Sequence, residues 1–123
     1  IDTEVYYAEM SWDILMKEIN NHKVKFSEIS KFPAVSRDLA LLIDNTINFS
    51  EIEQIAMKSE KKLLKQVTLF DVYEGKNLPE GKKSYAVNFM LQDESKTLTD
   101  KQIDAVMKKI QHNLQKDLNA TLR

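Results

Sequence analysis

The 123-residue sequence contains no cysteine, so neither a disulfide nor a thiolate metal site can form. It also lacks a signal-peptide pattern and an apolar run long enough to span a membrane. Its 18 basic and 19 acidic residues nearly balance. That balance argues against coating nucleic acid by bulk charge, although a local basic patch remains possible. We therefore expect a cytoplasmic protein with no membrane partner.

Signatures of catalysis and of cofactor binding are missing as well. No glycine-rich phosphate loop is present, so this segment is not expected to bind ATP. No Ser-His-Asp arrangement is supported by a local motif. His22 and His112 stand alone, without acidic or cysteine neighbours at ligand spacing, so we expect no metal site. The chain begins at Ile1 rather than methionine, which fits a piece of a longer protein.

What the sequence does contain is the make-up of one globular domain. Hydrophobic residues account for 42% and charged residues for 30%, as in folded soluble domains. Residues 1–30 are interpreted as a lead-in that joins the domain to something upstream. The lead-in is predicted to hold a short strand at residues 5–8, a helix capped by Ser11, and an extended stretch near residues 24–26. Trp12 is predicted to be a packing anchor.

Residues 31–123 are predicted to form the domain itself. Its expected strands cover residues 37–44, 64–74, 84–92 and, at one edge, 120–123. A helix lies between the first two strands and another precedes the last. This order predicts a ferredoxin-like α+β sandwich, in which two helices cover one face of a four-stranded antiparallel sheet.

Both helices of the domain carry a start signal and an apolar stripe. Ser50 with Glu53, and Thr99 with Gln102, have the spacing of a capping box. The expected stripes are Ile52, Ile55, Ala56 and Leu63 in the first helix, and Ile103, Val106, Met107, Ile110 and Leu114 in the second.

Strand alternation divides the remaining side chains between two faces of the sheet. The helix-facing set is predicted to be Leu39, Leu41, Ile43, Phe70, Val72, Tyr85, Val87, Phe89 and Leu91. The opposite, open face is predicted to carry Ala40, Asp71, Tyr73, Ser84, Ala86 and Asn88.

The open face has the chemistry of a base-binding pocket. Tyr73 offers an aromatic plane for a base, and Ala40 and Ala86 leave a low floor. Asp71 is an acceptor of the kind that binds the N1–H and N2–H edge of guanine, and Ser84 can donate or accept beside it. Such side chains are also common as ordinary solvated surface, which the pattern by itself favours.

Several basic residues are candidates for contacts with phosphates. Lys76, Lys82 and Lys83 surround the loop beside Tyr73, where phosphate contacts and plain solvation are equally consistent with the pattern. A lysine stripe at helical spacing fits an ordinary solvated face better: Lys58, Lys61, Lys62 and Lys65. Arg37 and Asp38 are predicted to form a structural ion pair.

Five motifs occur in a specific order along residues 31–123. They are FPAVSRDLA at 32–40, LFDVY at 69–73, LPEGKKS at 78–84, TLTD at 97–100 and ATLR at 120–123. Together they resemble the ferredoxin-fold anticodon-binding domain found at the C-terminus of bacterial phenylalanine–tRNA ligase beta subunits. The lead-in, from Val5 to Ile19, also resembles the end of the catalytic-like domain that precedes it in that family, together with its connector.

The resemblance implies roles for the open-face residues. Tyr73 is expected to stack on the first anticodon base, a guanine in the phenylalanine tRNA. Asp71 and Ser84 are expected to contact that base, with Ala40 lining the floor. The intact parent is expected to attach phenylalanine to its tRNA with ATP and magnesium, as an alpha2-beta2 enzyme. Its catalytic residues are expected on the alpha subunit, with none in this segment and no DNA partner.

Three positions depart from the family pattern. Ser36 stands where a second basic residue is frequent, and Asn88 stands where an arginine is common. Both changes remove positive charge and weaken the expected hold on the RNA backbone. Asn119 replaces a frequent glycine, a mild change because asparagine tolerates the left-handed conformation.

Three other functions remain open for such a fold. A small-molecule-binding regulatory domain needs a ligand crevice at a sheet edge, often lined by glycine, whereas both glycines here lie in one loop. An acylphosphatase-like enzyme needs a phosphate loop with an arginine, which residues 44–47 do not supply. A general single-strand RNA binder carries several exposed aromatic residues, whereas only Tyr73 is predicted in that position.

Overall fold

The fold is known from a computed structural model, which describes residues 2–26 and 28–123. The helices and strands, in chain order, are α1 (Trp12–Asn21), β1 (Val35–Asp44), α2 (Phe49–Ser59), β2 (Leu64–Tyr73), β3 (Lys82–Leu91), α3 (Asp100–Leu118) and β4 (Thr121–Leu122). Among the helices of the described residues, none is long and apolar enough to cross a membrane.

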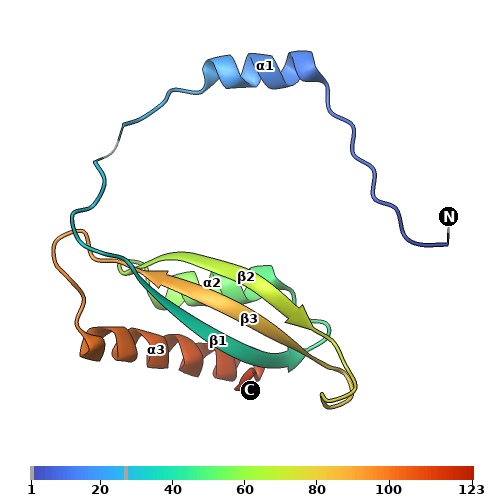
Figure 1. The fold of residues 1–123 in the computed structure, drawn as a ribbon, viewed down its shortest axis with the longest axis vertical. Coiled ribbons are helices and arrows are strands. Elements are labelled where there is room, and N and C mark those ends of the chain that lie inside the picture. Colours follow the sequence, from blue (N-terminus) through green and yellow to red (C-terminus); the bar gives the residue numbers. More distant parts are fainter. Residues whose placement is uncertain (1, 27) are drawn as a thin grey trace.

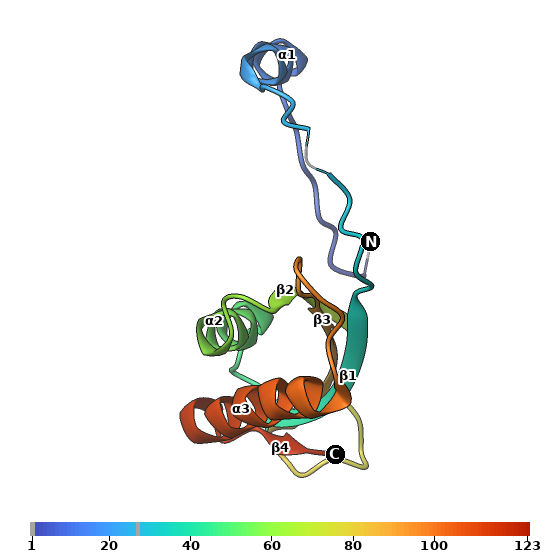
Figure 2. The same cartoon turned by 90° about the vertical axis from the view of Figure 1, so that its left-hand side faces the viewer.

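The strands form one antiparallel sheet in the order β2-β3-β1-β4. Helices α2 and α3 lie side by side on one face of this sheet, and the other face is left open (Figures 1 and 2). The predicted ferredoxin-like α+β sandwich is confirmed, including the short edge strand at the end of the chain.

The core lies between the sheet and the two helices. The predicted alternation of β3 is confirmed, because Tyr85, Val87, Phe89 and Leu91 are all buried. The whole predicted stripe of α3 is buried against them. On β1, Leu41 and Ile43 are buried on the same face. Strands β1 and β3 therefore present their odd-numbered residues to the helices, as alternation requires.

Strand β2 departs from the predicted alternation. Its register against β3 shifts twice, between Leu64 and Gln66 and between Leu69 and Asp71. The buried residues of β2 are Leu64 and Val67. Phe70 was predicted to face the helices but is 58% exposed on the open face. Val72 faces the helix side as predicted, since it pairs with Tyr85, but at 46% exposed it does not join the core. The prediction missed that a bulge inserts one extra residue and resets the alternation.

The start of α3 agrees with the prediction and the start of α2 does not. Thr99 and Gln102 form the predicted capping box. Helix α2 instead begins after Asn48, whose backbone N–H donates to Glu51 Oε1 at 2.8 Å. Asparagine caps as well as serine does, so Ser50 falls inside the first turn. The same helix ends at Ser59, which leaves the predicted stripe residue Leu63 beyond it.

The apolar side chains of the lead-in are largely exposed among the residues that the structure describes. Helix α1 forms as predicted, but it buries no residue, and Trp12 is 70% exposed rather than packed. No strand forms at residues 5–8, because no neighbouring strand supplies hydrogen bonds there. The total surface is 9730 Å², against about 6,800 Å² expected for a folded chain of 14.3 kDa.

Candidate nucleic-acid interface

The open face of the sheet brings the four predicted pocket residues together. Tyr73 pairs with Ser84 across β2 and β3, and Asp71 pairs with Ala86 one step along. Ala86 pairs in turn with Ala40 on β1. The two alanines therefore separate Asp71 from the β4 edge and form a low floor beside Tyr73.

The bulge in β2 decides which side chains reach this face. Leu69 pairs with Val87 on the helix side, and only one residue of β3 later Asp71 pairs with Ala86 on the open side. Without the extra residue, Asp71 and Tyr73 would follow Leu69 onto the helix side. Bulges often re-aim side chains in this way next to functional sites.

The ring of Tyr73 is held from two directions. A Cβ atom added at Gly75 would lie 2.6 Å from Cζ of Tyr73, so the ring occupies the space where any other residue has its side chain. Cζ of Arg123 lies 5.0 Å from the centroid of the Tyr73 ring, which is within range of a cation–π contact. The backbone N–H of Arg123 also donates to the carbonyl of Ala40 at 2.9 Å. A guanidinium thus covers part of the surface proposed for a base.

Asp71 and Ser84 differ in how readily a ligand can reach them. Asp71 is exposed, and one of its carboxylate oxygens accepts a 2.9 Å hydrogen bond from the backbone N–H of Val72. That bond uses one carboxylate oxygen, and the exposed carboxylate keeps further acceptor capacity for a ligand. Ser84 is only 5% exposed, so its hydroxyl lies at the bottom of the site rather than at its rim.

The three lysines near the loop have different surroundings. Lys76 is exposed in the loop itself. Lys82 forms a 2.7 Å ion pair with Asp44. Lys83 is 7% exposed, and its ammonium donates to the carbonyl of Asn45 at 2.8 Å. The Lys83 ammonium also sits 4.8 Å from the ring centroid of the helix-facing Tyr85. Geometry thus gives no support to a phosphate contact by Lys83.

Two other groupings expected from the sequence are not formed. Arg37 and Asp38 point to opposite faces because they are adjacent on β1, and the described residues show no ion pair between them. Asp38 instead accepts from Asn88. The lysine stripe does not share one helix, because α2 ends at Ser59, and Lys65 pairs with Glu94 at 2.7 Å.

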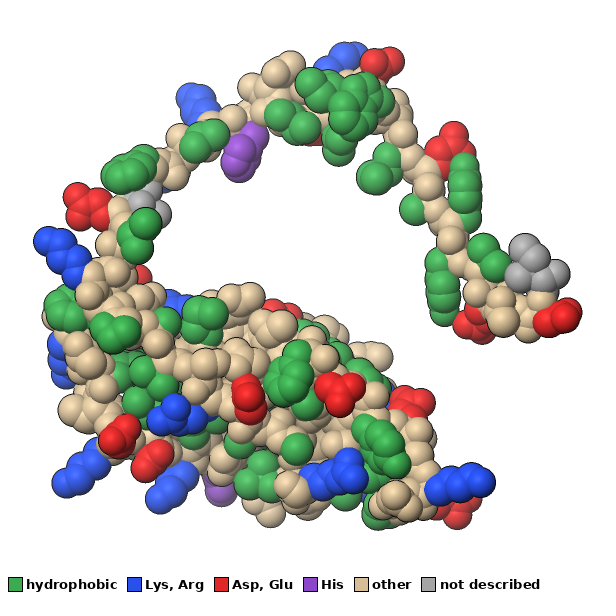
Figure 3. Space-filling model, in the orientation of Figure 1, with side chains coloured by type: hydrophobic (Ala, Val, Ile, Leu, Met, Phe, Trp, Pro, Cys, Tyr) green, Lys and Arg blue, Asp and Glu red, His purple; other side chains and the backbone are tan. Residues whose placement is uncertain are grey.

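The sequence analysis missed Phe70 and Arg123 as parts of this face. Phe70 is exposed and lies among open-face side chains, so Tyr73 is not the sole aromatic residue there. Figure 3 shows the face with scattered hydrophobic side chains and acidic side chains between them, and with basic side chains nearer its rim. The charge on this face is therefore mixed. No group of three metal-ligating side chains comes together within residues 2–26 and 28–123.

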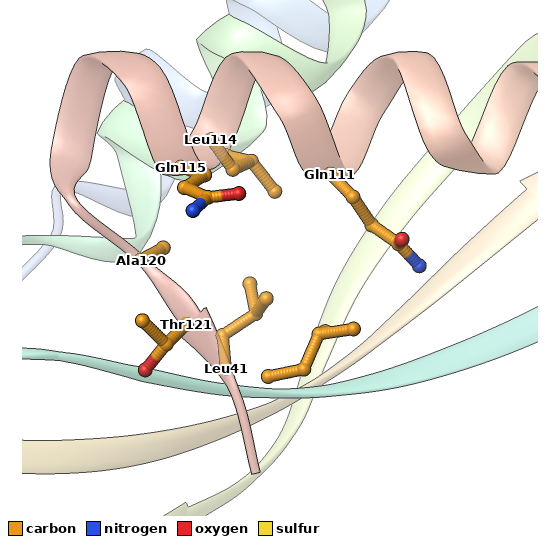
Figure 4. Close-up of a pocket in the computed structure, with 7 residues that line it drawn as sticks. Leu41, Gln111, Leu114, Gln115, Ala120 and Thr121 are labelled. Carbon is orange, nitrogen blue, oxygen red and sulfur yellow. The ribbon is translucent and has the colours of Figure 1, made fainter.

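A partly open hollow lies on the helix side of the sheet, at the β4 edge. This cavity of about 230 Å³ separates the end of α3 from β1 and β4 (Figure 4). Its lining consists of Leu41, Gln111, Leu114, Gln115, Ala120, Thr121 and Leu122. The lining contains no charged side chain and no glycine.

Comparison with known proteins agrees with this architecture. A family model for the ferredoxin-fold anticodon binding domain matches residues 30–123. Over the whole chain, the sequence is 63% identical to the phenylalanine–tRNA ligase beta subunit of Bacteroides fragilis, 55% identical to that of Porphyromonas gingivalis and 43% identical to that of Clostridium tetani. The chain spans about 15% of the length of each of these relatives. By its fold, its motifs and this match, the chain belongs to the family of ferredoxin-fold anticodon-binding domains.

Proposed function

We propose that this chain reads the first anticodon base of a phenylalanine tRNA on the open face of its sheet. The observation that carries the proposal is the convergence of Asp71, Tyr73 and Ser84 beside a floor made of Ala40 and Ala86. An aromatic plane with adjoining edge acceptors is how proteins bind an unstacked base.

The base would slide over the alanine floor and stack on Tyr73. It replaces the guanidinium of Arg123, whose contact with the ring is worth about 0.5–1 kcal/mol at an exposed site. The exposed carboxylate of Asp71 then accepts from N1–H and N2–H of guanine, an edge that adenine lacks. Ser84, which is buried at the bottom of the site, then contacts the base from below. Lys76 and Lys82 border the same loop and would contact phosphates there, Lys82 by giving up its ion pair with Asp44.

The proposal extends to the parent protein. Relatives of this chain carry the name of an aminoacyl-tRNA ligase subunit, so the intact protein would join phenylalanine to tRNA in the cytoplasm, with ATP and magnesium. The alpha subunit would hold the catalytic residues. Residues 1–30 would form a connector separate from the domain at 31–123. The apolar side of α1, which is exposed here, would pack on an upstream part of the protein.

A titration of this chain with RNA tests the proposal. The probe is an anticodon stem-loop of phenylalanine tRNA at low salt, beside a copy whose first anticodon guanine is replaced by adenine. We expect amide shifts at Ala40, Asp71, Tyr73 and Ser84 that weaken with the adenine copy. Shifts that avoid this face, or that are the same for both RNAs, contradict the proposed site.

Replacement of Tyr73 gives a second and independent test. Tyr73→Ala should weaken RNA binding, because stacking on an aromatic side chain is worth about 1–3 kcal/mol per base. Val72→Ala is the matched control, since Val72 is a neighbour of similar exposure that points to the helix side of the sheet. Equal affinities for the two variants would exclude Tyr73 as the stacking platform.

The cavity at the β4 edge bears on the alternative of a small-molecule-binding regulatory domain. Its volume of about 230 Å³ is below the roughly 300–1,000 Å³ of ordinary ligand sites. Two glutamines supply its only long polar side chains. The open face offers more specific chemistry, and we therefore favour the RNA function over the regulatory one.

A further inference from the structure

The open face carries a second exposed aromatic side chain next to the proposed guanine site. Phe70 is 58% exposed, whereas Phe89 on the neighbouring strand is fully buried. The bulge at Leu69–Asp71 places Phe70 on the open face. Covering this ring with a ligand would contribute up to about 1.5–3 kcal/mol to binding.

Phe70 borders a shallow depression with a mixed lining. The depression has a volume of about 410 Å³ and is lined by Asp38, Gln66, Thr68, Phe70, Asn88 and Met90. An aromatic ring and a thioether supply apolar contact, and four polar side chains surround them. This is the make-up of a site for a flat aromatic ligand with hydrogen-bonding edges, such as a nucleobase.

Two polar groups of the depression, Asn88 and Asp38, are already oriented by hydrogen bonds. The amide nitrogen of Asn88 donates to Oδ1 of Asp38 at 2.6 Å and also to the hydroxyl of Ser36. Both N–H groups of Asn88 are used by these two bonds, so its carbonyl oxygen is the group left for a ligand. Gln66 can supply a donor beside it. An amide acceptor and an amide donor together match N6 and N7 of adenine.

The spacing between the two aromatic residues fits two separate bases. Phe70 and Tyr73 are three residues apart on one strand, or about 10 Å. Bases that stay stacked are about 3.4 Å apart. The two rings therefore cannot serve one base or a continuous stack, and they suit two neighbouring bases that are splayed apart, as in a recognised RNA loop.

We propose that this depression, named the Phe70 site, binds the second anticodon base while the first lies on Tyr73. The proposal rests on the anticodon function proposed above. The base lies against Phe70 with its edge at Gln66 and Asn88. Adenine is the base that these amides suit, and the phenylalanine codons UUU and UUC pair with an adenine at this position.

A thermodynamic cycle between protein and RNA tests the Phe70 site. This chain, its Phe70→Ala variant and the control Val72→Ala are titrated with the anticodon stem-loop and with two copies that lack the first or the second anticodon base. We expect Phe70→Ala to weaken binding of the intact loop by about 5- to 150-fold, which corresponds to about 1–3 kcal/mol for one stacked base. The effect should vanish with the RNA that lacks the second base and persist with the RNA that lacks the first.

The outcomes separate this proposal from the anticodon function. If Tyr73→Ala weakens binding while Phe70→Ala matches Val72→Ala, the Phe70 site is wrong and the guanine site stands. If the loss in Phe70→Ala stays the same without the second base, the ring contacts another part of the RNA and the assignment is wrong. If neither aromatic residue affects binding, the anticodon function proposed for this face falls as well.

Discussion

Replacing Gly75 with alanine tests how closely the guanine site depends on the position of Tyr73. The new Cβ would lie 2.6 Å from Cζ of Tyr73 and 3.1 Å from Cε1. Carbon atoms in good contact are about 3.5–4.0 Å apart. The Tyr73 ring therefore has to move by about 1 Å, although the substitution removes none of the groups proposed to contact the base.

The size of the effect follows from the distance dependence of stacking. A gap of about 0.5–1 Å already forfeits a quarter to a half of a van der Waals contact. Applied to a stack worth about 1–3 kcal/mol, this gives a loss of about 0.3–1.5 kcal/mol. We expect Gly75→Ala to bind the anticodon stem-loop about 2- to 12-fold more weakly.

The assay is a titration of the RNA against Gly75→Ala, Tyr73→Ala and the double variant. Gly81→Asn is the matched control in the same loop, because a Cβ there meets no atom within 4 Å and asparagine tolerates its positive φ of 76°. If Gly75 acts only through the ring, its effect disappears in the Tyr73→Ala background. An unchanged affinity in Gly75→Ala, or an effect that survives the loss of Tyr73, would refute the reasoning.

Three further predictions concern stability, measured by urea unfolding. Thr99→Ala should cost about 1 kcal/mol by removing the cap of α3, whereas Ser50→Ala should change stability by less than about 0.5 kcal/mol because Ser50 does not cap α2. Ile110→Ala should cost about 2–5 kcal/mol, since Ile110 is fully buried between α3 and the sheet; a smaller loss would mean that the core is looser than described. Hydrogen bonds from the hydroxyl and amide of Ser95 hold the pKa of Asp93 below its usual value. Because the folded-state pKa is lowered, this stabilisation exists above the unfolded-state pKa and is lost as the pH falls through the folded-state value. The stability difference between the wild type and Asp93→Asn should thus shrink on acidification, and a constant difference would contradict the prediction.

The capping boxes show where local pattern succeeds and where it fails. Thr99 and Gln102 compete with no better cap, and α3 begins where the sequence predicts. Asn48 precedes Ser50 by two residues and has its own partner in Glu51. Starting the helix early also brings Phe49 into α2, where it packs against the core. Asn48 with Glu51 has the same capping-box spacing as Ser50 with Glu53, so spacing alone allows both starts, and the packing of Phe49 favours the earlier one.

The predicted face of each lysine depended on knowing the strand limits. Lys83 lies one residue before Ser84, yet it points to the helix side and binds the carbonyl of Asn45. Lys82 points to the open side and pairs with Asp44. The sequence analysis treated both as loop residues, which have no defined face, because the strand was expected to begin at Ser84.

Arg123 and Phe70 are part of the site only because their strands pair with strands that are distant in the sequence. Arg123 reaches Tyr73 because β4 pairs with β1, which brings together residues fifty positions apart. Phe70 is turned outward by a register shift against β3. No periodicity in the sequence marks either event, since each depends on the partner strand rather than on neighbours along the chain.

The sequence by itself determined the order of the elements, the buried faces of β1, β3 and α3, and the family, because these follow from periodicity and from motifs in order. The tertiary structure decided which further side chains, Phe70 and Arg123, join those predicted for the open face. A strand's alternation is fixed only relative to its partner, so one extra residue in β2 returned Asp71 and Tyr73 to that face and exposed Phe70 beside them. The physical reason is that the register of a strand depends on its hydrogen bonds and side-chain contacts with the partner strand. The sequence of one strand alone does not show where its register shifts.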